Sequence, residues 1–503
     1  MKSLVWFRND LRTDDNPALR AACFQSEEVH GVFIYSNNQM KLHNEANCKI
    51  EFIIENLKSL EKSLSELNIP LTIISSDGFY DNPKKIYNLI NERSITNIYW
   101  NNQFGEDEGL RDKKVKELLK KNNINYASYD DQVVFPAGTF KTVEGKPYSV
   151  FTPFKKRWVD NFNIDLLDIE FEYVPKAKTN ISSNINDFDF CFKTHHSVDI
   201  SIWPAGEKEA FIKLNNYLDK KIFDYAKNRN EPILEGTSRL SPYLTLGILS
   251  PNRCILEALK KNNFELDSGE KGVTKWIDEI VWREFYKNIM FSFPRVSKGK
   301  PFQDYTNKIK WRFNEEEFKA WKDGNTGFPL IDAAMRCLVE TGYLNFRMRS
   351  LIVSFFTHHL WQPWQACAHF LARQFLDFEP GIHYPQLQMQ AGVTGINMLR
   401  IYNPVKNGKE HDPKGVFIKQ WIPKLRVLPE AIVHTPWLMN SFETSIYGFK
   451  LGKDYPKPII DLEKSRKNAT STLWPISKSP AVRKEGKRIL AKHTLANRNS
   501  LMI

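Results

Sequence analysis

Cysteine is scarce in this sequence. The chain has six cysteines in 503 residues, and no two of them form a CxxC pair. Disulfide-rich folds and structural zinc or iron–sulfur sites need closely paired cysteines, so neither is expected. We predict reduced, buried thiols and no metal site.

Long apolar runs are missing as well. None approaches the roughly 18 residues that a membrane-spanning helix needs, so no membrane partner is expected. The opening MKSLVWFRNDLR returns to charge at Arg8 and lacks the apolar core of a secretory signal. These absences predict a cytoplasmic protein.

Two glycine-rich phosphate-binding motifs are also absent, namely GxGxxG after a strand and GxxxxGK[ST]. Their absence argues against an ordinary dinucleotide or nucleoside-triphosphate domain. The overall composition, with 42% hydrophobic and 26% charged residues, is that of a globular protein. The length suggests two to three domains.

The charge balance is basic. Lysine and arginine number 71 against 59 acidic residues, a formal net charge of +12. An excess of this size suits a polyanion such as nucleic acid, and equally a solvated basic surface.

Residues 1–130 alternate short apolar runs with helical patterns. The residues Ile50, Ile53, Ile54, Leu57, Leu60, Leu64 and Leu67 recur at the spacing of an amphipathic helix. Strand–helix alternation predicts a parallel, Rossmann-like sheet with helices on both faces. The expected strands are centred on the runs 4–7, 31–35, 71–74 and 95–100.

The rest of the chain divides by composition. Residues 131–205 are punctuated by prolines and read as an interdomain connector. Residues 206–470 carry amphipathic patterns almost throughout and predict an all-α domain. Residues 471–503 form a basic tail, with seven Lys or Arg against one Glu from residue 478 on. Such a tail is either a solvated helix or an arm that contacts phosphates.

The segment EGTSRLSP at 235–242 is the first candidate site. Ser241-Pro242 predicts a helix start with Ser241 as the N-cap. A helix start preceded by two hydroxyls and Arg239 suits a phosphate or pyrophosphate. The same pattern also fits a capped helix with a surface arginine.

A second candidate is the predicted helix that begins near Trp276. Trp276, Glu279, Arg283 and Tyr286 share one face, with Trp282 beside Glu279. Charged and large aromatic side chains on one stripe suit the lining of a cavity, and alternatively a buried ion pair in an aromatic core.

Arg349 and Asp377 form the third candidate, as a fixed ion pair. Beside a ring that gains an electron, such an arginine would stabilise the anion. A purely structural salt bridge is the alternative.

These segments together resemble the photolyase/cryptochrome family, in particular its bacterial class I-like members, up to about residue 460. The opening LVWFRNDLRTDDNPAL is similar to that family's first strand and turn. The other matching segments, in family order, are YSVFTPF at 148–154, EGTSRLS at 235–241, WREFY at 282–286, GNTGFPLIDAAMR at 324–336 and RIYNP at 400–404.

The resemblance implies FAD bound in the all-α domain. The implied cofactor-binding residues are Tyr225, Thr237, Ser238, Arg239, Leu240, Ser241, Trp276, Glu279, Arg283, Phe346, Arg349, Asp377 and Glu379. The implied catalytic residues are Glu279, Trp282, Arg349 and His383, with His383 beside flavin N5. The residues expected to contact DNA are Trp282, Arg347 and Met389.

The resemblance also implies a light-harvesting antenna, either a folate (methenyltetrahydrofolate) or a deazaflavin. Asp107, Glu108 and Lys298 match residues that contact a folate pterin, although two solvated charges at Asp107 and Glu108 would look the same in the sequence.

The chain departs from the family in its electron relay. Trp311 and Trp364 match the outer two of three relay tryptophans, but the inner position falls in 384–389, which contains no tryptophan. Tyr384 and Trp361 are the nearest aromatic replacements in sequence. A second tryptophan that faces the lesion is missing from the same stretch.

The resemblance therefore predicts an enzyme that binds DNA containing pyrimidine dimers and repairs cyclobutane dimers with light. Phe346 and Ser350 stand where (6-4) repair uses paired histidines, which favours cyclobutane dimers. The alternatives are a cryptochrome-like blue-light receptor without repair activity, and a photolyase for another lesion or for single strands. A monomer, associated with the nucleoid, is expected.

Overall fold

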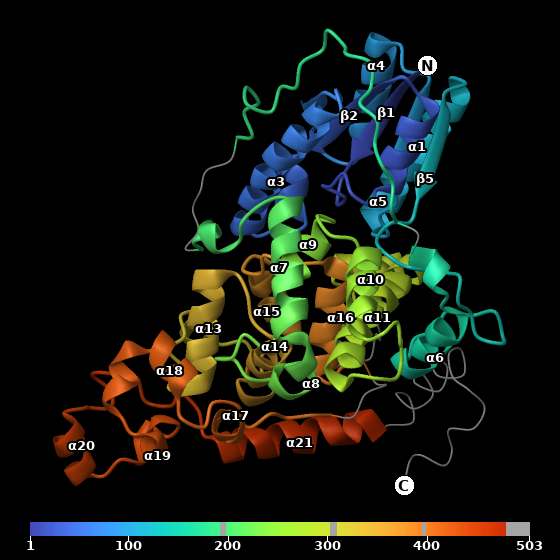
Figure 1. The fold of residues 1–503 in the computed structure, drawn as a ribbon. Helices are drawn as coiled ribbons and strands as arrows, with labels where there is room; N and C mark the ends of the chain where they lie inside the picture. Colours follow the sequence, from blue (N-terminus) through green and yellow to red (C-terminus); the bar gives the residue numbers. More distant parts are fainter. Residues whose placement is uncertain (168, 192–197, 302–308, 395–398, 479–503) are drawn as a thin grey trace.

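The computed structural model describes residues 1–167, 169–191, 198–301, 309–394 and 399–478. A parallel sheet with its helices lies at one end of the molecule, and the remaining helices lie at the other end (Figure 1). The predicted fold class is confirmed. The predicted basic tail falls outside the described residues from residue 479 on.

The sheet has five parallel strands in the order β3-β2-β1-β4-β5. In the central strand, Leu4 pairs with His30 on one side and Ile98 on the other. The strands are β1 Lys2–Phe7, β2 Glu28–Tyr35, β3 Leu71–Ser75, β4 Asn97–Asn101 and β5 Asn125–Tyr129. Strand β5 was not predicted, because its sequence NYASY carries no apolar run and lies half-exposed at the sheet edge.

Helices cover both faces of this sheet, as predicted. Alternate residues of β1 serve the two faces: Val5 and Phe7 pack in the core with α1 and α3, and Leu4 and Trp6 pack with α4 and α5. The helix bounds are α1 Pro17–Gln25, α2 Asn37–Leu42, α3 Asn47–Glu66, α4 Asn82–Arg93 and α5 Glu106–Lys121. The predicted amphipathic helix is α3, and Leu67 lies at its C-cap.

The connector contains a helix that the sequence analysis did not predict. Helix α6, Phe151–Asn161, buries Phe154 and Trp158 one turn apart and packs against α11, Lys271–Ser292. Short 3₁₀ turns at Ile164–Leu167 and Ile200–Ile202 complete the regular structure of the described part of the connector.

From residue 206 on, the described residues contain helices and no strand. Before α11 these are α7 Glu207–Lys220, α8 Tyr225–Asn228, α9 Ser241–Thr245 and α10 Pro251–Lys261. After it come α12 Glu315–Lys322, α13 Pro329–Thr341, α14 Phe346–Ser354, α15 Trp364–Ala372, α16 Pro380–Gln390, α17 Pro404–His411, α18 Val416–Trp421, α19 Glu430–Val433, α20 Ser441–Tyr447 and α21 Leu462–Lys478. A π-helical turn, Phe355–His359, extends α14.

One apolar core runs from the sheet into the helices, since Val5 and Phe52 belong to the same buried cluster as Ile255 and Ile277. A second core holds α13 to α16 together. Among the described residues, no helix combines the length and the apolar character needed to cross a membrane. The thiols are free. The prediction that they are buried is confirmed for four of the six, but Cys337 is only partly buried and Cys191 lies exposed on the connector.

Candidate functional site

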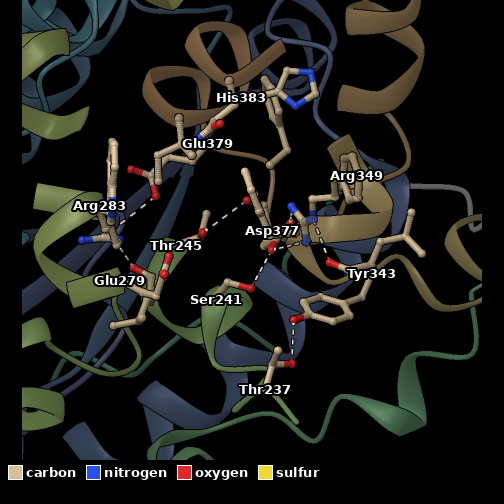
Figure 2. A pocket seen from close by; sticks show the side chains of 18 of the residues that line it. Thr237, Ser241, Thr245, Glu279, Arg283, Tyr343, Arg349, Asp377, Glu379 and His383 are labelled. Atoms are coloured by element: carbon tan, nitrogen blue, oxygen red, sulfur yellow. Dashed lines mark hydrogen bonds and ion pairs between the residues drawn. The ribbon is translucent and has the colours of Figure 1, made fainter. Parts of the chain in front are cut away.

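A cavity of about 290 Å³ opens between α9, α11, α14 and α16. Figure 2 shows its side chains converging from these separate elements. All thirteen residues proposed to bind the cofactor line it, and so do Trp282 and His383. The shared face predicted on α11 is therefore confirmed.

The segment before α9 forms one end of the cavity. Arg239 adopts a left-handed backbone conformation, with φ of 52°, which an arginine adopts only when its surroundings impose it. The Thr237 hydroxyl lies 3.1 Å from the Tyr343 hydroxyl. Two hydroxyls and a half-exposed guanidinium at this end provide donors suited to an anion.

The prediction that Ser241 caps a helix is wrong. Helix α9 begins at Ser241 itself, and its hydroxyl donates to Asp377 Oδ2 at 2.5 Å. An ionised carboxylate accepts hydrogen bonds and donates none, so the hydroxyl is the donor in this contact.

Arg349 and Asp377 form the predicted ion pair. Arg349 donates to both carboxylate oxygens, at 3.0 Å from Nη1 and 2.7 Å from Nη2. Its Nε donates to the Leu344 carbonyl at 2.8 Å, and its guanidinium lies 4.1 Å from the ring centre of Phe375. The arginine is therefore held in one orientation at the cavity wall (Figure 2).

Glu379 lies between two cations. Arg283 Nη2 is 3.5 Å from Glu379 Oε2, and Lys287 forms an ion pair with Oε1. Burial lowers the pKa of Lys287 to about 8, against the opposing effect of Glu379. Burial alone would raise the pKa of Glu379, but Arg283 and Lys287 lower it. Lys287 was missed by the sequence analysis, although it follows Arg283 by one helical turn.

Glu279 and Arg283 of α11 do not pair with each other, although they are one helical turn apart. Glu279 does not pair with Arg283 but with Arg229, whose Nη1 lies 2.5 Å from Glu279 Oε1. Arg283 instead donates to the carbonyls of Gln132 and Leu244, at 2.8 and 3.0 Å. Glu279 thus lies on the more exposed side of the cavity. Arg283 is buried at the base of the cavity, where these hydrogen bonds hold it.

Trp282 forms part of an aromatic wall. Its ring stacks on Phe151 of α6 with centroids 3.6 Å apart and planes 9° apart. On the same helix, Tyr286 lies 5.8 Å from it at 24°. Phe151 was not proposed as a site residue, although it lies in the matching segment at 148–154.

His383 is buried against the rings of Phe375 and Phe378 and hydrogen bonds to a backbone carbonyl. Its Nε2 lies 2.9 Å from the Ala368 oxygen, so this nitrogen carries the proton. Burial lowers the pKa of His383 to about 4. The ring is therefore neutral near pH 7, with Nδ1 left as an acceptor.

Two of the residues expected to contact DNA lie outside this cavity. Arg347 is partly buried, with its guanidinium 5.6 Å from the ring centre of Tyr402. Met389 is partly buried near the end of α16. Neither lines the cavity.

The relay residues form two groups. The rings of Trp311 and Trp361 are in contact, with centroids 4.8 Å apart. Tyr384 is buried, 5.3 Å from the ring of His383. Trp364 is buried in the same core, and Leu387 lines the cavity where an inner tryptophan would be expected.

The three antenna residues converge although the chain separates them widely. Asp107 and Glu108 lie in the first turn of α5, and Lys298 pairs with Asp107 from a 3₁₀ turn at Pro294–Lys298. Partial burial opposes ionisation of Asp107, but hydrogen bonds from Lys298 and His43 lower its pKa.

Two further residues of this second site were missed. His43 Nε2 lies 3.0 Å from Asp107 Oδ2, and its ring centre is 5.1 Å from that of Phe79. Within the described part of the chain, Glu108 Oε2 is buried without a hydrogen-bond partner. His43 and Phe79 carry no local signal in the sequence, because only the packing of separate loops brings them to α5.

Comparison with known proteins agrees with this geometry. A family model described as the FAD binding domain of DNA photolyase matches residues 276–475, and one described as DNA photolyase matches residues 3–176. The deoxyribodipyrimidine photo-lyase of Escherichia coli is 33% identical over 468 residues, which are 92% of this chain and 96% of that protein.

Solved structures show the same fold. A class III photolyase from Agrobacterium tumefaciens has a TM-score of 0.84 at 27% identity, covering 96% of this chain and 98% of that one. A cryptochrome from Synechocystis has a TM-score of 0.81 at 23% identity, covering 94% and 99%.

Proposed function

Because this chain belongs to the DNA photolyase family, we propose that it is a deoxyribodipyrimidine photolyase that splits cyclobutane pyrimidine dimers in DNA with light. One observation carries the proposal: a single cavity joins the Arg349–Asp377 pair, Glu379 and the exposed edge of the Trp282 wall.

The donors of the cavity fit FAD. Hydroxyl and guanidinium donors of Thr237, Ser238 and Arg239 suit its pyrophosphate. The carboxylates of Asp377 and Glu379, each held by an arginine, suit the polar edge of its ring system. When bound and reduced, FAD supplies the light-excited electron that splits the dimer.

The remaining contribution of the protein is position and electrostatics. Arg349 keeps a fixed positive charge at the cavity wall, where it stabilises an anion in a site of low dielectric constant. Glu279, on the more exposed side, accepts a hydrogen bond from a pyrimidine N–H. Trp282 stacks against the extruded bases, whose extrusion costs a few kcal/mol and costs less for damaged bases.

Two side chains support the proposed lesion type. Phe346 and Ser350 line the cavity at the positions where (6-4) repair uses paired histidines. Neither side chain donates or accepts a proton as a histidine does, which supports cyclobutane dimers as substrate.

The decisive experiment is a light-dependent assay on an oligonucleotide with one cyclobutane thymine dimer. Wild-type protein with reduced FAD is expected to restore two thymines in blue light and not in darkness.

A second candidate function, a cryptochrome-like receptor without repair, is favoured by Leu387 at the inner relay position. Bound FAD with no repair under full reduction would contradict repair of cyclobutane dimers and leave that receptor, or a photolyase for another lesion or for single strands, as the function.

We also propose that the second site, formed by His43, Phe79, Asp107, Glu108 and Lys298, binds a folate antenna. A pterin carries an amino group that can donate a hydrogen bond to the unpaired oxygen of Glu108. It also has a flat ring that Phe79 can contact. Reconstitution with methenyltetrahydrofolate is expected to add its absorption band, and Glu108→Leu to weaken it. Uptake of a deazaflavin and not the folate would contradict this assignment.

A further inference from the structure

Helix α16 turns a polar face toward the cavity. His383, Gln386 and Gln390 follow at intervals of three and four residues, so they lie on one side of the helix, and all three line the cavity. Gln386 lies in the stretch 384–389, in which the tryptophans expected from the family resemblance are missing, and Gln390 follows directly after it. No role has been assigned to them so far.

The amide oxygen of Gln386, Oε1, is buried and has no hydrogen-bond partner among the described residues. Buried polar atoms are nearly always paired, because leaving one unpaired is costly. Gln388, two residues on, is buried and donates to the Lys300 carbonyl at 3.2 Å. Gln386 is one of the residues that line the cavity, so a molecule bound there lies beside this side chain.

The chemistry of that molecule follows from the amide group. A primary amide holds an acceptor beside a donor and carries no charge. Its complement is an N–H beside a carbonyl, which is the edge of a cyclic imide. The carboxylates of Glu279 and Glu379 accept hydrogen bonds but donate none when ionised, so neither can contact both positions of such an edge.

We propose that Gln386 recognises the edge of a cyclic imide bound in the cavity. This inference rests on the proposed function, which brings two such edges to the cavity: that of a thymine in the dimer and that of the isoalloxazine ring. Both present N3–H beside a carbonyl, and methylation at N3 removes the donor from either one.

The test compares wild type with Gln386→Leu. A matched control is Gln365→Leu, since Gln365 Oε1 is also buried without a partner among the described residues but does not line the cavity. The probes are an oligonucleotide with one thymine dimer, the same oligonucleotide with both dimer thymines methylated at N3, FAD, and FAD methylated at N3. Dissociation constants are measured in the dark.

If the lesion is the partner, wild type and Gln365→Leu are expected to bind the methylated dimer more weakly than the unmethylated one. In Gln386→Leu this preference should be roughly three- to tenfold smaller, as for one lost neutral hydrogen bond, and the part that remains belongs to Glu279. If flavin is the partner, the same pattern appears with the two FAD forms. The proposal would be overturned if the ratio of dissociation constants, methylated over unmethylated, were the same in wild type and Gln386→Leu for both the dimer and FAD. Absent repair in light would instead contradict the proposed function, since the binding comparisons do not depend on it.

Discussion

The indole of Trp282 lies flat on the ring of Phe151, with centroids 3.6 Å apart and planes 9° apart. This contact joins α11, which lines the cavity, to α6 of the connector. One face of the indole is therefore occupied by the protein, and Phe151 supports the aromatic wall from outside the cavity.

Trp282→Ala is expected to lose preference for damaged DNA by about 1–3 kcal/mol, the value of one base stack. Binding to undamaged DNA should stay nearly unchanged, because phosphate contacts dominate it. Titration of duplexes with and without a dimer measures both quantities. Phe151→Leu is the control, since it loosens the wall but leaves the indole in place. Equal losses on damaged and undamaged DNA would place Trp282 in a purely structural role.

Arg349→Leu is expected to lower the free energy of unfolding by about 3 kcal/mol and to weaken FAD retention. The reason is that Asp377, whose side chain is 4% exposed, would keep a buried charge after losing its bidentate ion pair with Arg349. Urea unfolding and flavin release measure the two effects. The double variant Arg349→Leu/Asp377→Leu should recover part of the stability and none of the flavin. Recovery of both would show that the pair does not contact FAD.

Photoreduction of oxidised flavin is expected to be slow or rerouted, while repair stays intact after chemical reduction. Leu387 cannot donate an electron, and Tyr384 lies next to His383, which lines the cavity. Tyr384→Phe and Trp361→Phe should slow photoreduction further in transient absorption. Fast photoreduction that is unaffected by Trp364→Phe would show that the relay runs elsewhere.

Stability is expected to fall in acid because of His383. Its pKa is lowered from 6.5 to about 4 in the folded protein, so below pH 6.5 the unfolded chain binds a proton that the folded chain does not. Between pH 6.5 and 4 this group should lower the free energy of unfolding by about 3 kcal/mol, at about 1.4 kcal/mol per pH unit. Urea unfolding of wild type and His383→Gln across this range isolates the effect, because His358 titrates alike in both. Parallel pH profiles would contradict it.

DNA affinity is expected to fall with salt, with a log–log slope of about −0.9 per phosphate contacted. Removing residues 479–503 takes away six Lys or Arg and one Glu. The truncated protein should bind damaged and undamaged DNA with equally reduced affinity and a shallower slope. An unchanged slope would show that the tail does not contact phosphates.

Local periodicity in the sequence determined much of this protein. Alternating apolar runs predict four of the five strands, because side chains along a strand point to opposite faces and β1 fills two cores. The spacing of Trp276, Glu279, Arg283 and Tyr286 predicts one face of a helix, and that face lines the cavity. Strand β5 was not predicted because its pattern is short and weakly apolar. Helix α6 was not predicted because prolines such as Pro153 marked its stretch as a connector.

Only the tertiary structure decided which groups meet. Glu279 pairs with Arg229 and Arg283 with Glu379, although Glu279 and Arg283 are one turn apart. Lys298 reaches Asp107 across 191 residues of chain. The sequence around a charged residue does not identify its ion-pair partner, because the partner depends on how whole helices pack. That packing is determined by apolar surfaces far from the charges themselves.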